Sequence, residues 1–208
     1  GIGLSIQYIP HITRVSTPED ALEELTQKDY DLVITMTRLS GMNLMEFGQK
    51  VKAIIPGIPV ILLTYEWLDT AFLLRLQELK SVDKVFYWAG NSQILLAIIK
   101  YIEDLNNVDN DIKHGVQVIL LIEDSPKFHS IFLPMLYVEL MTQTRSLVSE
   151  GVNDLHRLLR MRARPKILMA DSYEEGERLY RKYKYKLLGV ISDVELPHEG
   201  KIDDSAGI

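Results

Sequence analysis

The sequence has 208 residues, of which 47% are hydrophobic and 25% are charged, as in soluble globular proteins with one large domain or two small ones. Its formal net charge of -6 argues against nonspecific nucleic-acid binding, because that activity requires a positive surface. No apolar run is long enough to span a bilayer, and the absence of cysteine excludes disulfides, thiolate zinc sites and cysteine nucleophiles. We therefore expect neither nucleic acid nor membrane as a partner, and the lack of an export signal predicts a cytoplasmic protein.

Short, continuous apolar runs mark the expected strands, as in parallel sheets whose strands are buried on both faces. In chain order, these runs cover residues 31–36, 59–64, 84–88, 116–122, 166–170 and 187–192. The pattern between them predicts helices at 17–29, 44–54, 67–79 and 92–105 and a long helical region over 125–162. Strands that alternate with helices indicate βαβ units, so we expect an α/β protein.

A polar stretch over residues 106–115 interrupts this alternation, which then begins again. We therefore expect two copies of one small doubly wound architecture. The first domain is predicted at 1–107 and the second at 116–208, with a linker at 108–115 between them.

A basic series lies in the second domain, at Arg157, Arg160, Arg162, Arg164 and Lys166. We interpret it as a solvated helix end, where positive charge complements the helix dipole. Contact with an adjacent acidic domain is the alternative.

Acidic residues follow two of the expected strands of the second domain: Glu123 and Asp124 after residues 116–122, and Asp193 after residues 187–192. Because the carboxyl ends of parallel strands meet at one edge of a sheet, we expect three carboxylates in one shallow pocket. Such a cluster raises its own pKa values unless a cation compensates, and Mg²⁺ prefers oxygen ligands of this kind. An aspartate beside the ion can attack a phosphoryl group. The alternative is that these acids only end their strands at a solvated edge.

The run 119–125 (ILLIEDS) resembles the first strand and acidic pair of response-regulator receiver domains, and the run 189–200 (GVISDVELPHEG) resembles their third strand, phosphoacceptor and following loop. The resemblance implies a flavodoxin-like, doubly wound parallel sheet with Asp193 as the phosphoacceptor. It also implies Mg²⁺ held by Glu123, Asp124, Asp193 and the main-chain carbonyl of Glu195. The implied function is phosphorelay signal transduction in a two-component system. A histidine kinase or another phosphodonor and a neighbouring effector module are the implied partners.

The first domain resembles the same family without its chemistry. Its strand at 31–36 resembles the one that carries the phosphoacceptor, but Met36 occupies the acceptor position, and a thioether neither accepts a phosphoryl group nor binds Mg²⁺. Thr64 stands where the family has its switch hydroxyl, and Trp88 stands where it has a lysine. The resemblance therefore implies a pseudo-receiver that binds another surface.

Both copies are incomplete relative to this family. The first has no acidic first strand, and the second stops at Ile208, just after its third strand, so we expect a piece of a longer protein. The open sheet edge favours pairing between two copies as a homodimer. The segments 123–137, 156–166 and 173–200 resemble the paired receiver-like region that precedes phosphoenolpyruvate synthase-like, ATP-grasp kinase modules.

Two alternatives to a phosphorylated receiver therefore stay open. One is a pseudo-receiver scaffold for docking or dimerisation, and the other is the regulatory N-terminal part of such a kinase. We assign no enzyme activity to this chain itself, because the catalytic module would lie outside the sequence.

Overall fold

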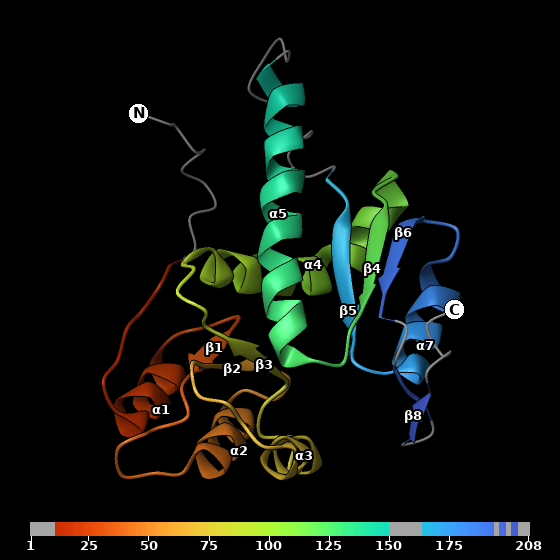
Figure 1. Ribbon diagram of the computed structural model, residues 1–208. Coiled ribbons are helices and arrows are strands. Elements are labelled where there is room, and N and C mark those ends of the chain that lie inside the picture. The colour runs from red at the N-terminus through yellow and green to blue at the C-terminus, as the bar shows by residue number, and fades with distance from the viewer. Residues whose placement is uncertain (1–10, 150–163, 194–195, 199–200, 204–208) are drawn as a thin grey trace. The chain divides into compact units, whose positions relative to one another are not determined.

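The computed structural model describes residues 11–149, 164–193, 196–198 and 201–203. Over these residues the chain is a mixed α/β protein (Figure 1), and its contacts divide it into two compact units between Tyr87 and Trp88. In chain order, the elements are α1 (Pro18–Gln27), β1 (Val33–Thr35), α2 (Leu44–Ile54), β2 (Val60–Thr64), α3 (Thr70–Glu78), β3 (Lys84–Tyr87), α4 (Gln93–Asp111), the 3₁₀ turn η2 (Ile112–His114), β4 (Val118–Ile122), α5 (Pro126–Ser149), β5 (Lys166–Ala170), α7 (Tyr173–Tyr183), β6 (Leu187–Ser192), β7 (Leu196–His198) and β8 (Lys201–Asp203). Within the described part of the chain, no helix has the length and apolar character needed to cross a membrane.

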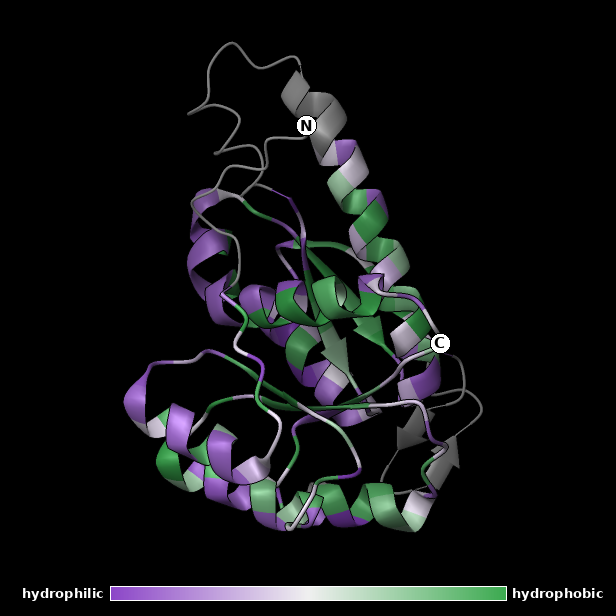
Figure 2. Cartoon of the chain, turned by 90° about the vertical axis from the view of Figure 1, so that its left-hand side faces the viewer, coloured by the Kyte–Doolittle hydropathy of each residue, from purple (hydrophilic) through white to green (hydrophobic). Residues whose placement is uncertain are grey.

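The first unit is a parallel sheet in the order β1-β2-β3, with α1, α2 and α3 on the same side of it (Figure 1). Polar caps begin two of these helices, since Thr17 accepts the N–H of Asp20 and Asn43 accepts the N–H of Glu46, as is usual at helix N-termini. The strands are predominantly hydrophobic, whereas the helices carry both kinds of residue (Figure 2). Apolar helix faces pack on the central strand β2, whose five residues are all buried.

The second unit contains a parallel sheet in the order β5-β4-β6. Three of the five residues of its central strand β4, namely Val118, Leu120 and Leu121, are no more than 1% exposed, and the other two are partly buried. The helix α7 packs on β4 and β5, while α4 packs on β5 and α5. An antiparallel hairpin of β7 and β8, which the sequence did not predict, follows β6.

The helix α4 is longer than predicted, and it belongs to the second unit and not to the first. Residues 108–111 form its last turn and residues 112–114 the 3₁₀ turn, so all of the predicted linker at 108–115 except Gly115 is helical. Its contacts place α4 in the second unit, whereas the domain boundary predicted from the sequence placed residues up to 107 in the first domain. Val108 is 3% exposed and belongs to the apolar cluster of the second sheet. Burial of this side chain explains why the polar residues around it continue the helix.

A buried polar network joins α4 to α5 and to the start of β5. The carboxylate of Asp104 is fully buried and receives two hydrogen bonds from the guanidinium of Arg164, at 2.7 and 2.9 Å. The hydroxyl of Tyr137 donates to it at 2.8 Å and the backbone N–H of Ile167 at 2.9 Å. Burial raises the pKa of Tyr137 well above its usual value, which keeps the phenol protonated as a donor. Lys166 lies 3.6 Å from Asp104 and 2.9 Å from Asp111.

This network corrects the interpretation of the basic series as a solvated helix end. Arg164 and Lys166 are each under 10% exposed, at 8% and 6%, and they neutralise a buried carboxylate instead of facing water. Such a group is tolerated inside a protein only when it is paired and hydrogen-bonded. The other three members of the series, at positions 157, 160 and 162, lie outside the described residues.

Candidate metal centre

Two neighbouring strand ends carry the acidic residues that the sequence singled out. β4 ends at Ile122, immediately before Glu123 and Asp124, and β6 ends at Ser192, immediately before Asp193. The two strands are parallel and pair Ile122 with Ser192, so both chains leave the sheet at the same edge. The backbone fixes the acids there, because the N–H of Asp193 donates to the carbonyl of Ile122 at 3.0 Å.

The structure brings the three predicted carboxylates together. One carboxylate oxygen from each of Glu123, Asp124 and Asp193 lies within 4.8 Å of the other two. Glu123 is buried, Asp193 is half-buried and Asp124 is exposed, so the cluster has one wall inside the protein and one side open to solvent. Three oxygens at this separation can share one small divalent cation, which in proteins keeps part of its water shell.

The pKa values of Glu123 and Asp124 are raised, by burial first and by the neighbouring negative charges second, as expected of crowded carboxylates. Burial is the main cause of the raised pKa of Glu123, and the negative charges of Asp193 and Asp124 add to it. The N–H of Ser125, which donates to Glu123 Oε1 at 3.1 Å, acts in the opposite direction. Partial desolvation also raises the pKa of Asp124, followed by the charges of Asp193 and Asp171. A bound cation would relieve this repulsion, so the residues present fit a hard metal ion.

Asp171 is a fourth acid at this edge, and the sequence analysis did not identify it. It follows Ala170, the last residue of β5, which pairs with Ile122 at the end of β4. Its charge contributes to the raised pKa of Asp124, and its backbone N–H donates to Glu175 Oε2 at 3.1 Å. A single acid beside the capping residue Ser172 gives little signal in the sequence, because helix N-termini commonly carry acids.

Glu195, whose main-chain carbonyl was expected as a further metal ligand, lies outside the described residues. The first unit presents different chemistry at the same edge of its sheet. Met36 follows β1 directly and is 43% exposed, in the position relative to its strand that Asp193 has after β6. Thr64 ends β2, is 1% exposed, and accepts the N–H of Glu66 at 3.0 Å. Trp88, expected at the position of the family's lysine, follows β3 and is 39% exposed.

In comparisons with known proteins, no protein-family model matches this sequence, and no curated protein matches it.

Proposed function

We propose that this chain is a phosphorelay receiver region, in which the second unit accepts a phosphoryl group on Asp193 in a Mg²⁺-dependent step. The observation that carries the proposal is the cluster of Glu123, Asp124 and Asp193, with ligand oxygens within 4.8 Å of one another at the carboxyl edge of a parallel sheet. Ligand sites of doubly wound sheets lie at this edge, where the strand order reverses. The order β5-β4-β6 supports the flavodoxin-like reading, because the strand that is first in sequence stands in the middle.

In the proposed reaction, Asp193 is the nucleophile, and Glu123 and Asp124 are metal ligands. A carboxylate oxygen of Asp193 attacks the phosphorus of the donor, the bond from phosphorus to the leaving group breaks with its electron pair, and an aspartyl phosphate results. Asp193 is half-buried and so remains open to a donor on the solvent side. A bound Mg²⁺ would neutralise charge on the transferred group. Glu123 and Asp124 would hold the ion on the side of β4. The buried side chain of Glu123 forms the side of the site that lies inside the protein.

The proposed partners follow from this chemistry. A histidine kinase or small phosphodonor supplies the phosphoryl group, and a neighbouring effector module responds to it. The first unit is proposed to act as a pseudo-receiver that contacts other surfaces, because the exposed thioether of Met36 stands where an acceptor would be.

The direct test incubates the chain with acetyl phosphate and MgCl₂ and locates the adduct by peptide mass spectrometry. We expect one phosphoryl group on Asp193, none without Mg²⁺ and none in Asp193→Asn. Asp171→Asn is the matched control, since it removes an acid from the same edge that is outside the cluster, and it should still be modified. An adduct that persists in Asp193→Asn, or no adduct at all, contradicts the proposal.

Magnesium titration separates this proposal from a constitutive docking scaffold. A receiver site should give saturable thermal stabilisation by Mg²⁺, equal to RT ln(1 + [Mg²⁺]/Kd), and Asp124→Asn should abolish it. A scaffold in which the acids have no ligand should show the same small ionic-strength effect in both proteins.

A further inference from the structure

The helix α5 contains a run of residues 128–138 (FHSIFLPMLYV) that has no carboxylate, lysine or arginine. The described structure buries one face of this run. Leu133 and Tyr137 are no more than 1% exposed, and the hydroxyl of Tyr137 donates to Asp104 of α4 at 2.8 Å. Arg164, where the described chain resumes after α5, lies over the Tyr137 ring on this same face, 5.2 Å from its centroid. A helix that is hydrophobic all round is normally buried all round, so we expect a partner on the opposite face.

The opposite face presents four large apolar side chains, which we call the α5 stripe: Phe128, Ile131, Phe132 and Met135. They are 47%, 43%, 40% and 63% exposed. Residues that follow the first by three, four and seven positions lie on one side of a helix. A side chain of this size has on the order of 200 Å² of surface, so the α5 stripe exposes roughly 400 Å² of apolar area. Apolar patches of this size often mark interaction sites.

The area of the α5 stripe fits a small interface between two copies of the chain. Two copies that pack stripe against stripe would remove roughly 800 Å² from water, before the residues around the stripe are counted, whereas standard interfaces bury about 1,200 Å² or more. A two-fold arrangement uses the same patch on both copies, so the apolar face of each is covered by the other. We therefore expect a dimer that forms reversibly and depends on concentration.

The charged residues at the two ends of the α5 stripe determine the direction of packing. Lys127 lies four positions before Ile131 and Glu139 lies four positions after Met135, so both continue the stripe, and both are exposed. In an antiparallel pair, the Lys127 end of one copy lies beside the Glu139 end of the other. A parallel pair would bring like charges together at both ends, and it would also align the positive ends of the two helix dipoles.

We infer that the α5 stripe is the surface through which two copies of this chain form an antiparallel, two-fold dimer. Packing about a midpoint at Leu133 sets Phe128 of one copy against Val138 of the other, and Ile131 of one against Met135 of the other. Apolar packing supplies the affinity, and the charged ends set the register. This surface is separate from the open sheet edge that the sequence suggested for a homodimer.

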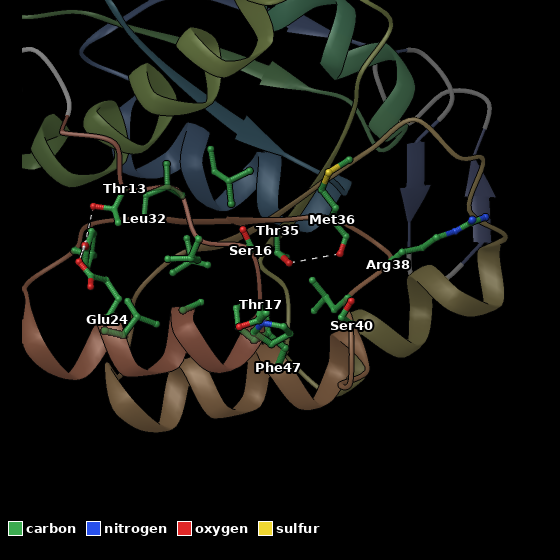
Figure 3. Close-up of a pocket in the computed structure, with 18 residues that line it drawn as sticks. Thr13, Ser16, Thr17, Glu24, Leu32, Thr35, Met36, Arg38, Ser40 and Phe47 are labelled. Carbon is green, nitrogen blue, oxygen red and sulfur yellow. Dashed lines mark hydrogen bonds between the residues drawn. The ribbon is translucent and has the colours of Figure 1, made fainter.

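Sedimentation velocity of the full chain over roughly 1–500 μM tests the dimer, whose dissociation constant we expect on the order of tens of μM. Met135→Asp places a carboxylate in the middle of the α5 stripe and should weaken the dimer about tenfold or more. Met36→Asp is the matched control, because Met36 is an exposed methionine of the first unit, at the cavity beside β1 (Figure 3). It should leave the dimer unchanged. Thermal melts followed by circular dichroism compare the folding of the two variants.

Cysteine variants test the direction of packing, because the chain has no cysteine of its own. A mixture of Phe128→Cys and Val138→Cys copies should form a disulfide-linked dimer when copper phenanthroline is added as the oxidant. Phe128→Cys alone should form none, since its two copies in an antiparallel pair lie about 15 Å apart along the helices, and a disulfide needs Cα atoms within about 7 Å of each other.

Three outcomes overturn the inference. The first is a chain that stays monomeric over the whole concentration range; a lower melting temperature of the Met135→Asp monomer would then mean that another part of the same chain covers the α5 stripe. The second is a dimer that Met135→Asp weakens no more than Met36→Asp does, because association would then use another surface. The third is a disulfide-linked dimer of Phe128→Cys alone, which would mean parallel packing.

Discussion

Replacing Asp104 by alanine removes the acceptor of four hydrogen bonds inside the second unit, two of them from Arg164. The change leaves the Arg164 guanidinium, which is 8% exposed, without its counter-charge. Breaking a buried ion pair from one side costs about 3–5 kcal/mol. With a typical urea slope of about 2 kcal/mol/M, the unfolding midpoint should fall by about 2 M. The lost free energy of about 3–5 kcal/mol is a large part of the total free energy of unfolding of a domain, which is roughly 5–15 kcal/mol.

Glu103→Ala is the matched control, since it removes the neighbouring acid of the same helix. Glu103 pairs with Lys100 at 2.6 Å in a partly exposed i,i+3 pair, which contributes about 0.5 kcal/mol or less. Urea unfolding followed by hydrogen exchange of β4 and β5 peptides reports on the second unit, and peptides from β2 provide an internal reference. Equal losses in the two variants would refute the reasoning, because they would mean that the Asp104 carboxylate is as well solvated as a surface acid.

Further predictions concern the acidic cluster and two glycines. Because the pKa values of Glu123 and Asp124 are raised in the folded state, the folded protein binds more protons than the unfolded chain between the ordinary and the raised values. The free energy of unfolding should therefore fall as pH rises from the ordinary pKa values to the raised ones, and it should level off at higher pH. Thermal melts in EDTA should show this fall. The fall should be shallower in Asp124→Asn. Gly48→Ala should destabilise the first unit by about 1–3 kcal/mol, because a Cβ there would lie 2.0 Å from the carbonyl oxygen of Ser81. Gly176→Ala should cost less, since the contacting atom is the end of a side chain that can shift; melts followed by circular dichroism compare the two.

The strands were predictable from the sequence because buried parallel strands leave a local signal of consecutive apolar residues. The predicted bounds of β5 and β6 match the structure, whereas β1 is three residues long where six were expected. The shortening has a physical reason, since β1 has a partner on one side alone among the described strands. The C-terminal end of α4 was predicted six residues too early because the polar residues around Val108 resemble a loop, and only the second sheet supplies the surface that buries that side chain.

The candidate site was predictable to the extent that strand ends converge. Three acids were expected together because they directly follow two strands, and this is where they lie. The contacts between Asp104 and Arg164 were not predictable, because 60 positions separate the two residues and no local pattern connects them. Asp171 was missed for a related reason, since its relevance depends on β5 lying next to β4.

The location of α4 determines how this protein can be dissected. A piece expressed from residue 116 onward, where the composition changes, would carry Arg164 and Lys166 into an interior that no longer holds their acidic partners, and it should be recovered misfolded or aggregated. A piece beginning at Trp88 retains both sets of charges, so the short segment between β3 and α4 is the place to separate the halves without damaging either.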